Sequence, residues 1–201
     1  MTSEEAGRRP DEGGGRSRIE LTEPTAMRAL AHPVRWALLE ALGDAGTLTA
    51  TQASEILGES PANCAFHLRT LAKYGFVEEA GGGRGRERPW RRVHRGMSWS
   101  TVQDDPRAAV AAAALNDLWL GRVLERIRAS IDNEHAWPPE LRHRLGGSVS
   151  RMYVTPDEAD ALYREMQEIL VRYVAEREDP GKRPPDAMPI EMSLFGYPLM
   201  S

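Results

Sequence analysis

The order of segments between residues 26 and 95 constrains the fold of this chain more than any other feature. A long helical stretch comes first, and two shorter helix-forming stretches follow it, one opening at Thr49 and the other at Ser60. Threonine and serine are favoured helix caps, and Pro61 is a residue type favoured at the first helical position. A glycine-rich and arginine-rich hairpin sequence, residues 76–93, then closes the segment. The pattern predicts three helices followed by a small sheet.

Apolar spacing supports each helix. The first is expected over residues 25–42, with a break at Pro33 between a short helix and a longer one. In the second, Ala53, Ile56 and Leu57 are expected to face inward. In the third, a buried stripe is expected at spacing i, i+4 and i+7, which leaves a second set of side chains outward. The buried set is Cys64, Leu68 and Leu71, and the outward set is Asn63, Phe66, Arg69, Thr70 and Lys73.

The hairpin is expected to have strands at residues 76–80 and 88–93 and a turn at 81–85. It holds six arginines within twelve residues, opposed in that stretch only by Glu87; they are Arg84, Arg86, Arg88, Arg91, Arg92 and Arg95. A helix for the major groove beside a cationic ribbon for phosphates is the arrangement of a winged helix-turn-helix. We therefore predict an α+β fold, mainly α with small β, with a winged helix-turn-helix domain over residues 18–96.

Charge is distributed unevenly along the chain. The formal net charge is −4, but residues 16–95 hold 12 Lys/Arg against 9 Asp/Glu, and residues 96–201 hold 12 against 17. A local basic ribbon on an acidic body suits focused phosphate contact rather than general polyanion binding. The single cysteine cannot form an internal disulfide, and neither a secretory signal nor a membrane-spanning stretch is visible. These features predict a cytoplasmic protein without a membrane partner.

The remaining chain is expected to form a disordered tail at residues 1–17 and a C-terminal dimerisation region, helical to α+β, at residues 97–201. The latter should contain a helix over 107–133, strands at 149–154 and 190–195, and a helix opened by a capping box at Thr155 and Glu158. The helix over 107–133 carries too much apolar surface to remain exposed to solvent. It is therefore the candidate dimer interface; alternatively, it packs only against the C-terminal layer of its own chain. The candidate interface residues are Leu115, Leu118, Trp119, Val123, Leu124, Ile127 and Ile131.

Residues 29–35 followed by residues 38–42 resemble the first helix of the ArsR-type winged-helix repressors. Residues 60–75, with the run His67–Leu71 and the exit Gly75–Val77, resemble the recognition helix of the same family. The similarity covers residues 26–93, and the tail resembles C-terminal segments of some members. The resemblance implies a homodimeric transcriptional regulator, usually a repressor that an effector releases from DNA.

The predicted contacts with double-stranded DNA come from three places. Helix 60–74 would lie in the major groove, backbone amides near Thr49–Thr51 and Ser60–Ala62 would hold phosphates, and the basic wing over residues 81–92 would contact phosphates or the minor groove. Phe66 could instead be core, and His67 could be a packed histidine. The candidate DNA-binding residues are Thr49, Thr51, Ser60, Ala62, Asn63, Ala65, Phe66, His67, Arg69, Thr70, Arg84, Arg86, Arg88 and Arg91.

No cofactor and no metal site are expected. Cys64 is a single soft ligand on the buried stripe, and His135 and His143 do not share a helical face with Asp132 and Glu134. Metal-sensing ArsR members carry clustered ligands that this chain lacks. Methionines and aromatics near the C-terminus either fill a small core or line a pocket for an unidentified small-molecule effector.

Catalytic patterns are also missing from the sequence. It shows no nucleophile elbow, no phosphate-cradling glycine loop that opens a helix, and no paired carboxylates in an apolar setting. We therefore expect no enzyme. The alternative to DNA binding is a winged-helix module for protein–protein interaction, in which the apolar residues of helix 60–74 contact a partner protein.

Overall fold

The computed structural model describes residues 18–82, 88–94, 96–142, 144–177 and 180–199. The chain forms two compact units, Met1–Arg122 and Val123–Ser201, and each is described by itself. The division falls inside a long helix, whereas the sequence pattern placed a domain boundary after residue 96. The expected disordered tail, residues 1–17, lies outside the described residues.

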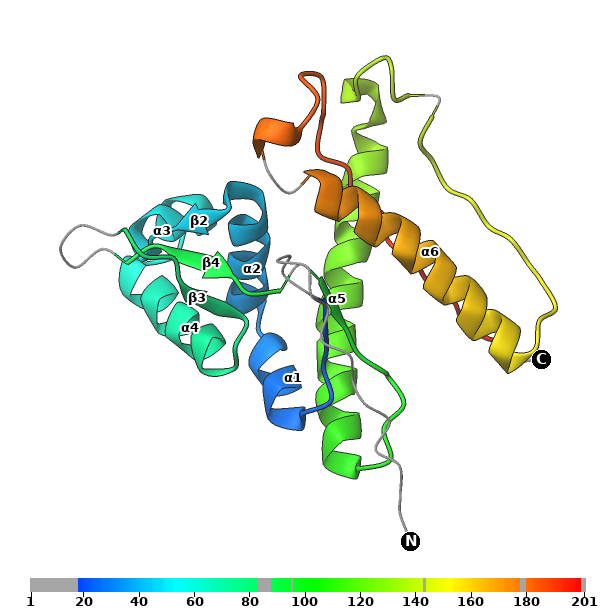
Figure 1. Cartoon of the computed structure of the whole chain (residues 1–201), viewed down its shortest axis with the longest axis horizontal. Coiled ribbons are helices and arrows are strands. Elements are labelled where there is room, and N and C mark those ends of the chain that lie inside the picture. Colours follow the sequence, from blue (N-terminus) through cyan, green and yellow to red (C-terminus); the bar gives the residue numbers. More distant parts are fainter. Residues whose placement is uncertain (1–17, 83–87, 95, 143, 178–179, 200–201) are drawn as a thin grey trace, which may run out of the picture. The chain divides into compact units, whose positions relative to one another are not determined.

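The first unit contains the helices and the hairpin that the sequence predicts (Figure 1). Two antiparallel strands, β3 (Val77–Glu79) and β4 (Trp90–Arg92), form the wing hairpin, and β2 (Thr47–Leu48) pairs with the other side of β4. The helices are α1 (Pro24–Leu30), α2 (Pro33–Ala45), α3 (Ala50–Leu57) and α4 (Pro61–Lys73). This is an α+β winged helix-turn-helix, and it confirms the predicted fold class.

Local caps explain where these helices begin. The break before α2 arises because Pro33 occupies its first position and the His32 Nδ1 accepts the Val34 N–H at 3.2 Å. Thr49 forms a capping box with Gln52 at the start of α3, and the Ser60 Oγ accepts the Asn63 N–H at the start of α4. Gly58, at φ 70°, supplies the left-handed turn between α3 and α4.

The core lies where α4 packs against α2 and α3. Cys64, Leu68 and Leu71 are completely buried, as their spacing predicted, and Ala53 of α3 is buried beside them. The inward expectation for Ile56 is wrong, because its side chain is 59% exposed. The buried face of α3 consists of Ala53 and Ser54, with Leu57 partly buried, and it does not extend round the helix to Ile56.

A parallel pair of short strands was not foreseen. β1 (Arg18–Glu20) runs beside β5 (Gly96–Ser98), with Ile19 opposite Met97. After β5, Trp99 stacks edge-on between Trp36 of α2 and Trp119 of α5 (Pro106–Asp132). The start of α5 adds Ala111, Ala112 and Leu115 to the same core as α2 and α4; it is therefore part of the first unit.

The second unit holds the end of α5, the short 3₁₀ segments η1 (Glu134–Ala136) and η2 (Pro180–Lys182), and α6 (Pro156–Arg177). The capping box is confirmed, since the Glu158 carboxylate accepts the Thr155 N–H at 2.8 Å. No described residue of α6 is buried in the chain. Among the described residues, no helix is long and apolar enough to cross a membrane.

The two strands expected in the second unit, residues 149–154 and 190–195, are not formed. An alternating sequence becomes a strand only when another backbone accepts and donates its ladder hydrogen bonds. Here the described segment around Tyr153 has no strand beside it, and that side chain is 99% exposed. The expectation of a paired β layer in this region was wrong.

Candidate nucleic-acid interface

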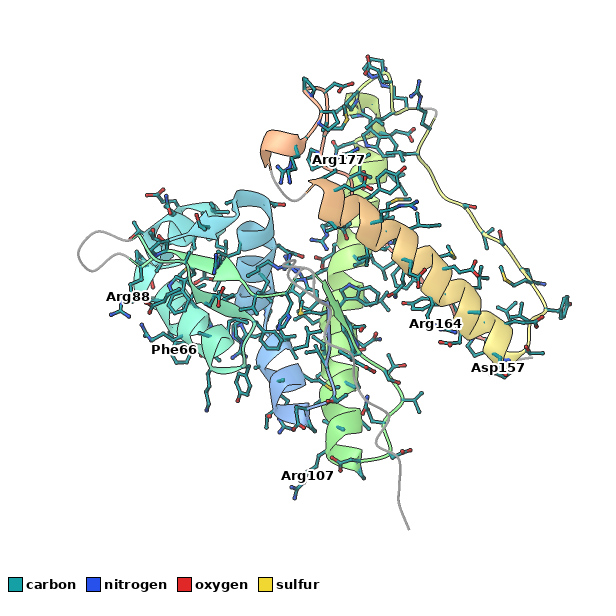
Figure 2. The ribbon with its side chains drawn as sticks, viewed as in Figure 1. Phe66, Arg88, Arg107, Asp157, Arg164 and Arg177 are labelled. Atoms are coloured by element: carbon teal, nitrogen blue, oxygen red, sulfur yellow. The ribbon has the colours of Figure 1, made fainter. Side chains whose placement is uncertain are left out.

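The outer face of α4 carries a stripe of four side chains, Ala62, Phe66, Arg69 and Lys73. Their spacing of i, i+4, i+7 and i+11 places them on one side of the helix, opposite Cys64, Leu68 and Leu71. Phe66 is 56% exposed, so it is a surface residue and not part of the core (Figure 2). We call these four residues the α4 stripe. It combines apolar contact with two positive charges.

Two polar residues that flank the α4 stripe already have partners. The Asn63 amide donates to the Glu59 carboxylate at 2.7 Å, and the Thr70 hydroxyl donates to the Phe66 carbonyl at 3.0 Å. Each side chain keeps further hydrogen-bonding capacity, because the Asn63 amide has a second N–H and its Oδ1, and the Thr70 hydroxyl can still accept. Arg69 has no such bond among the described residues, so its guanidinium is available to a ligand. Ala65 is half-buried on the other flank of α4.

His67 does not belong to this face, and its predicted contact with DNA is corrected. Its side chain is 5% exposed, and its ring lies 4.5 Å from that of His32. Burial lowers the pKa of His67, the nearby His32 and Arg35 lower it further, and Glu59 opposes them. A neutral histidine in the core cannot reach a base edge, so His67 is a packing residue of the helix-turn-helix.

At the starts of α3 and α4, Thr49 and Ser60 accept the Gln52 and Asn63 N–H groups and Pro61 has none, so the remaining first-turn amides are those of Thr51 and Ala62 and of Ala50. The Thr49 hydroxyl is used in its capping box, while Thr51 and Ala62 are exposed in the first turns of α3 and α4, as is the α4 cap Ser60. Helix N-termini carry unpaired N–H groups and a partial positive charge, which favours an anion there. Both starts can therefore contact phosphate.

The wing hairpin contains ion pairs that the sequence reading did not foresee. Arg88 pairs with Glu79 at 2.6 Å and Arg91 pairs with Glu78 at 2.8 Å, across the register in which Glu78 lies opposite Arg91. The bond to Glu79 raises the pKa of Arg88. Glu78 and Glu79 of β3, which lie outside the arginine-rich stretch counted in the sequence, therefore add two acids opposite the arginines. Arg84 and Arg86 lie outside the described residues.

The predicted dimer residues of α5 divide into two groups. Leu115 and Val123 are buried within the chain, which removes them from a surface seam, and Leu118 and Trp119 are partly buried and pack against the first unit's core. The three predicted interface residues that are exposed all lie in the second unit: Leu124, Ile127 and Ile131. Of the seven predicted residues, these three have the exposed side chains that a second copy could cover.

Among the described residues, no group of three or more histidine, cysteine or acidic side chains is placed to hold a metal ion. Sequence reasoning missed Glu59, Glu78 and Glu79 as partners of candidate DNA-binding residues. The i, i+4 spacing of Glu59 and Asn63 was a usable signal, whereas the cross-strand pairs depend on a register that only the folded hairpin fixes.

The three-helix core, the antiparallel hairpin and the exposed α4 stripe define a winged helix-turn-helix domain, the fold of many DNA-binding transcriptional regulators. A helix-turn-helix domain model matches residues 30–80. The solved structure of a cysteine-to-serine mutant of MarR from E. coli is similar at 13% identity and a TM-score of 0.32, over 72% of this chain and 85% of that one. No curated protein matches the chain.

Proposed function

We propose that the protein is a sequence-specific transcriptional regulator that binds double-stranded DNA through α4, with a binding and not a catalytic role. The observation that carries this proposal is the division of α4 into a fully buried stripe and the exposed α4 stripe. A helix about 10–12 Å wide fits the major groove when one face is free and the other is anchored. A cytoplasmic location follows from this role.

The side chains of the α4 stripe suggest which bases the protein would recognise. Phe66 and Ala62 offer apolar surface to thymine methyl groups, and the Arg69 guanidinium can donate two hydrogen bonds to guanine. The amides at the starts of α3 and α4, together with the wing, would hold phosphates and fix the register. Lys73 adds a charge at the far end of the α4 stripe.

The finer assignment is an ArsR-type homodimeric repressor released by an unidentified small-molecule effector. The sequence resemblance over residues 26–93 supports the type. Leu124, Ile127 and Ile131 of α5 are exposed, as is the apolar side of α6 that contains Met166 and Ile169, and such surface is costly unless another chain covers it. Two-fold regulators bind two half-sites about one DNA turn apart.

A protein-interaction module is the second candidate, and two observations favour it. Phe66 is an exposed aromatic residue of the kind that anchors protein interfaces, and Glu59 places a negative charge beside the α4 stripe where phosphates would approach. The acidic composition of residues 96–201 agrees with this alternative.

Selection from random duplexes tests the proposal. The wild-type protein should enrich a motif, and Arg69→Ala should relax the preference at one base position with a loss of about 1–3 kcal/mol there. Arg107→Ala, an exposed arginine at the start of α5, is the matched control and should select the wild-type motif (Figure 2). No enrichment by folded wild-type protein would favour the protein-interaction alternative.

A further inference from the structure

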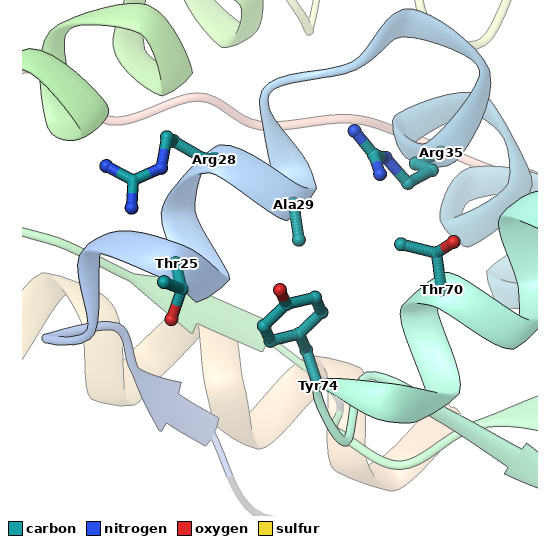
Figure 3. A pocket seen from close by; sticks show the side chains of 6 residues that line it. All are labelled: Thr25, Arg28, Ala29, Arg35, Thr70 and Tyr74. Carbon is teal, nitrogen blue, oxygen red and sulfur yellow. The ribbon is translucent and has the colours of Figure 1, made fainter.

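A pocket of about 230 Å³ lies between α1, α2 and the end of α4 (Figure 3). Its wall holds two arginines, Arg28 from α1 and Arg35 from α2, and Figure 3 shows them on opposite sides of the pocket, with the Tyr74 hydroxyl pointing toward Ala29. The other lining residues are Thr25, Ala29 and Thr70. No acidic side chain lines the pocket, so its lining carries two positive charges and no negative one.

The arginines of this pocket lack partners within the described chain. Neither Arg28 nor Arg35 forms a salt bridge to a described carboxylate. By contrast, most described arginines of the wing and of α5 are paired with a glutamate. The Arg35 Nε is buried and has no hydrogen-bond acceptor. Burial lowers the pKa of Arg35, because the charged form loses water. A buried, unpaired guanidinium donor is costly, and an oxyanion in the pocket would offset that cost.

The position of the pocket indicates where such an oxyanion would come from. Thr70 and Tyr74 lie on the flank of α4 next to the α4 stripe, at positions i+4 and i+8 from Phe66. An α-helix nearly fills the width of the major groove, about 12 Å, so the sugar–phosphate backbone runs directly along its flanks. When the α4 stripe faces the base edges, this pocket faces the backbone on one side.

We propose that Arg28, Arg35 and the Tyr74 hydroxyl bind a backbone phosphate of the duplex that α4 reads. This inference rests on the proposed function and adds an anchor from α1 and α2 to the contacts from α3, α4 and the wing. The planar guanidinium of Arg35 matches the geometry of a phosphate, and the Tyr74 hydroxyl can donate a further bond. Such a contact fixes the position of the protein without reading sequence.

The test is a salt titration of binding to the enriched duplex, followed by fluorescence anisotropy. Arg35→Gln should reduce the slope of log affinity against log salt by about one, and Arg28→Gln with Arg35→Gln by about two. The loss should be equal on specific and random duplexes, with an unchanged selected motif. Arg35→Lys should keep the slope because it keeps the charge. Arg107→Gln removes one exposed arginine away from the pocket and should match wild type.

A second arm locates the phosphate itself. Neutral methylphosphonates placed one at a time along the duplex should weaken wild-type binding at one flanking position and have no further effect on the Arg28→Gln, Arg35→Gln protein. Circular dichroism and thermal melting confirm that each variant is folded. A folded double variant with the wild-type slope would overturn the pocket assignment and leave the proposed function standing. A wild-type protein that binds no duplex would overturn both.

Discussion

Phe66 and His67 are adjacent on α4, yet one side chain faces solvent and the other lies in the core. The 100° turn between consecutive helical residues is enough to separate them, because the edge of the buried stripe passes between these two positions. The spacing of Cys64, Leu68 and Leu71 could predict the centre of that stripe. It could not predict the edge, since that depends on how closely α1 and α2 approach the helix.

Replacing Phe66 tests the exposed face at the residue scale. Phe66→Ala should change the free energy of unfolding by no more than about 0.5 kcal/mol, because the ring is mostly in solvent, and should weaken binding to the enriched duplex. Leu68→Ala is the buried control and should cost about 2–5 kcal/mol. Urea unfolding and anisotropy measure the two effects. A Phe66→Ala protein as unstable as Leu68→Ala would contradict the exposure of Phe66.

The His32–His67 pair makes stability depend on pH. Both pKa values are lowered from 6.5, mainly by burial and also by Arg35, so the folded protein binds fewer protons than the unfolded chain. The pair's contribution to stability is therefore fully present above about pH 6.5 and is lost as the pH drops below it. His67→Leu should flatten this fall in thermal melting between pH 7 and pH 5. His135→Gln, at an exposed site, should keep the wild-type dependence, and an unchanged slope in His67→Leu would contradict the account.

At the scale of elements, the wing is less cationic than its arginine count suggests. Glu78 and Glu79 on β3 lie opposite Arg91 and Trp90 of β4; Glu78 pairs with Arg91 of that strand, and Glu79 pairs with Arg88, which precedes the strand. Exposed pairs of this kind add little stability, about 0–1 kcal/mol. Their larger effect is to neutralise charge that would otherwise attract phosphate.

Releasing Arg88 from its partner should strengthen DNA binding. Glu79→Gln should raise affinity and steepen the salt slope by about one, because the freed guanidinium can then contact phosphate. The unfolding free energy should fall by less than about 1 kcal/mol. Glu125→Gln changes the net charge equally at an exposed site in the second unit and serves as the control. Equal effects of the two variants would show that only net charge matters.

Local signals predicted most of the winged helix-turn-helix. Thr49, Ser60 and Pro61 placed the helix starts, and Pro33 placed the break, because caps depend on a few neighbouring residues. The parallel pairing of β1 with β5 joins residues nearly eighty positions apart, which no local pattern encodes. The same limit explains the strands wrongly expected near Tyr153 and Phe195, where the alternation is present but no partner strand is.

At the scale of the whole molecule, the second unit leaves apolar side chains in solvent on both its helices. Leu124, Ile127 and Ile131 follow one another along α5 at spacings of three and four, and α6 has no buried residue among those described. This surface agrees with association of two copies, as a regulator of two-fold operators requires. The proposed dimer is thus confined to the part of α5 after Arg122.

Light scattering tests whether the dimer forms through the part of α5 after Arg122. The wild-type protein should have about twice the chain mass of 22.4 kDa, and Leu124→Glu with Ile127→Glu should shift it toward the monomer, because charges in an apolar seam are costly. Val102→Glu, at an exposed loop position in the first unit, should remain dimeric. A monomeric wild-type protein that still binds a palindromic site tightly would exclude the dimer.

The contact between α4 and DNA can be measured most directly with a photocrosslinking amino acid in place of Phe66. Irradiation with the enriched duplex should give a crosslink to a base within the selected motif. The same group in place of Val110, which is exposed on α5, should give none. A duplex bound and protected by the folded protein but never crosslinked from position 66 would contradict the assignment of the α4 stripe to the major groove.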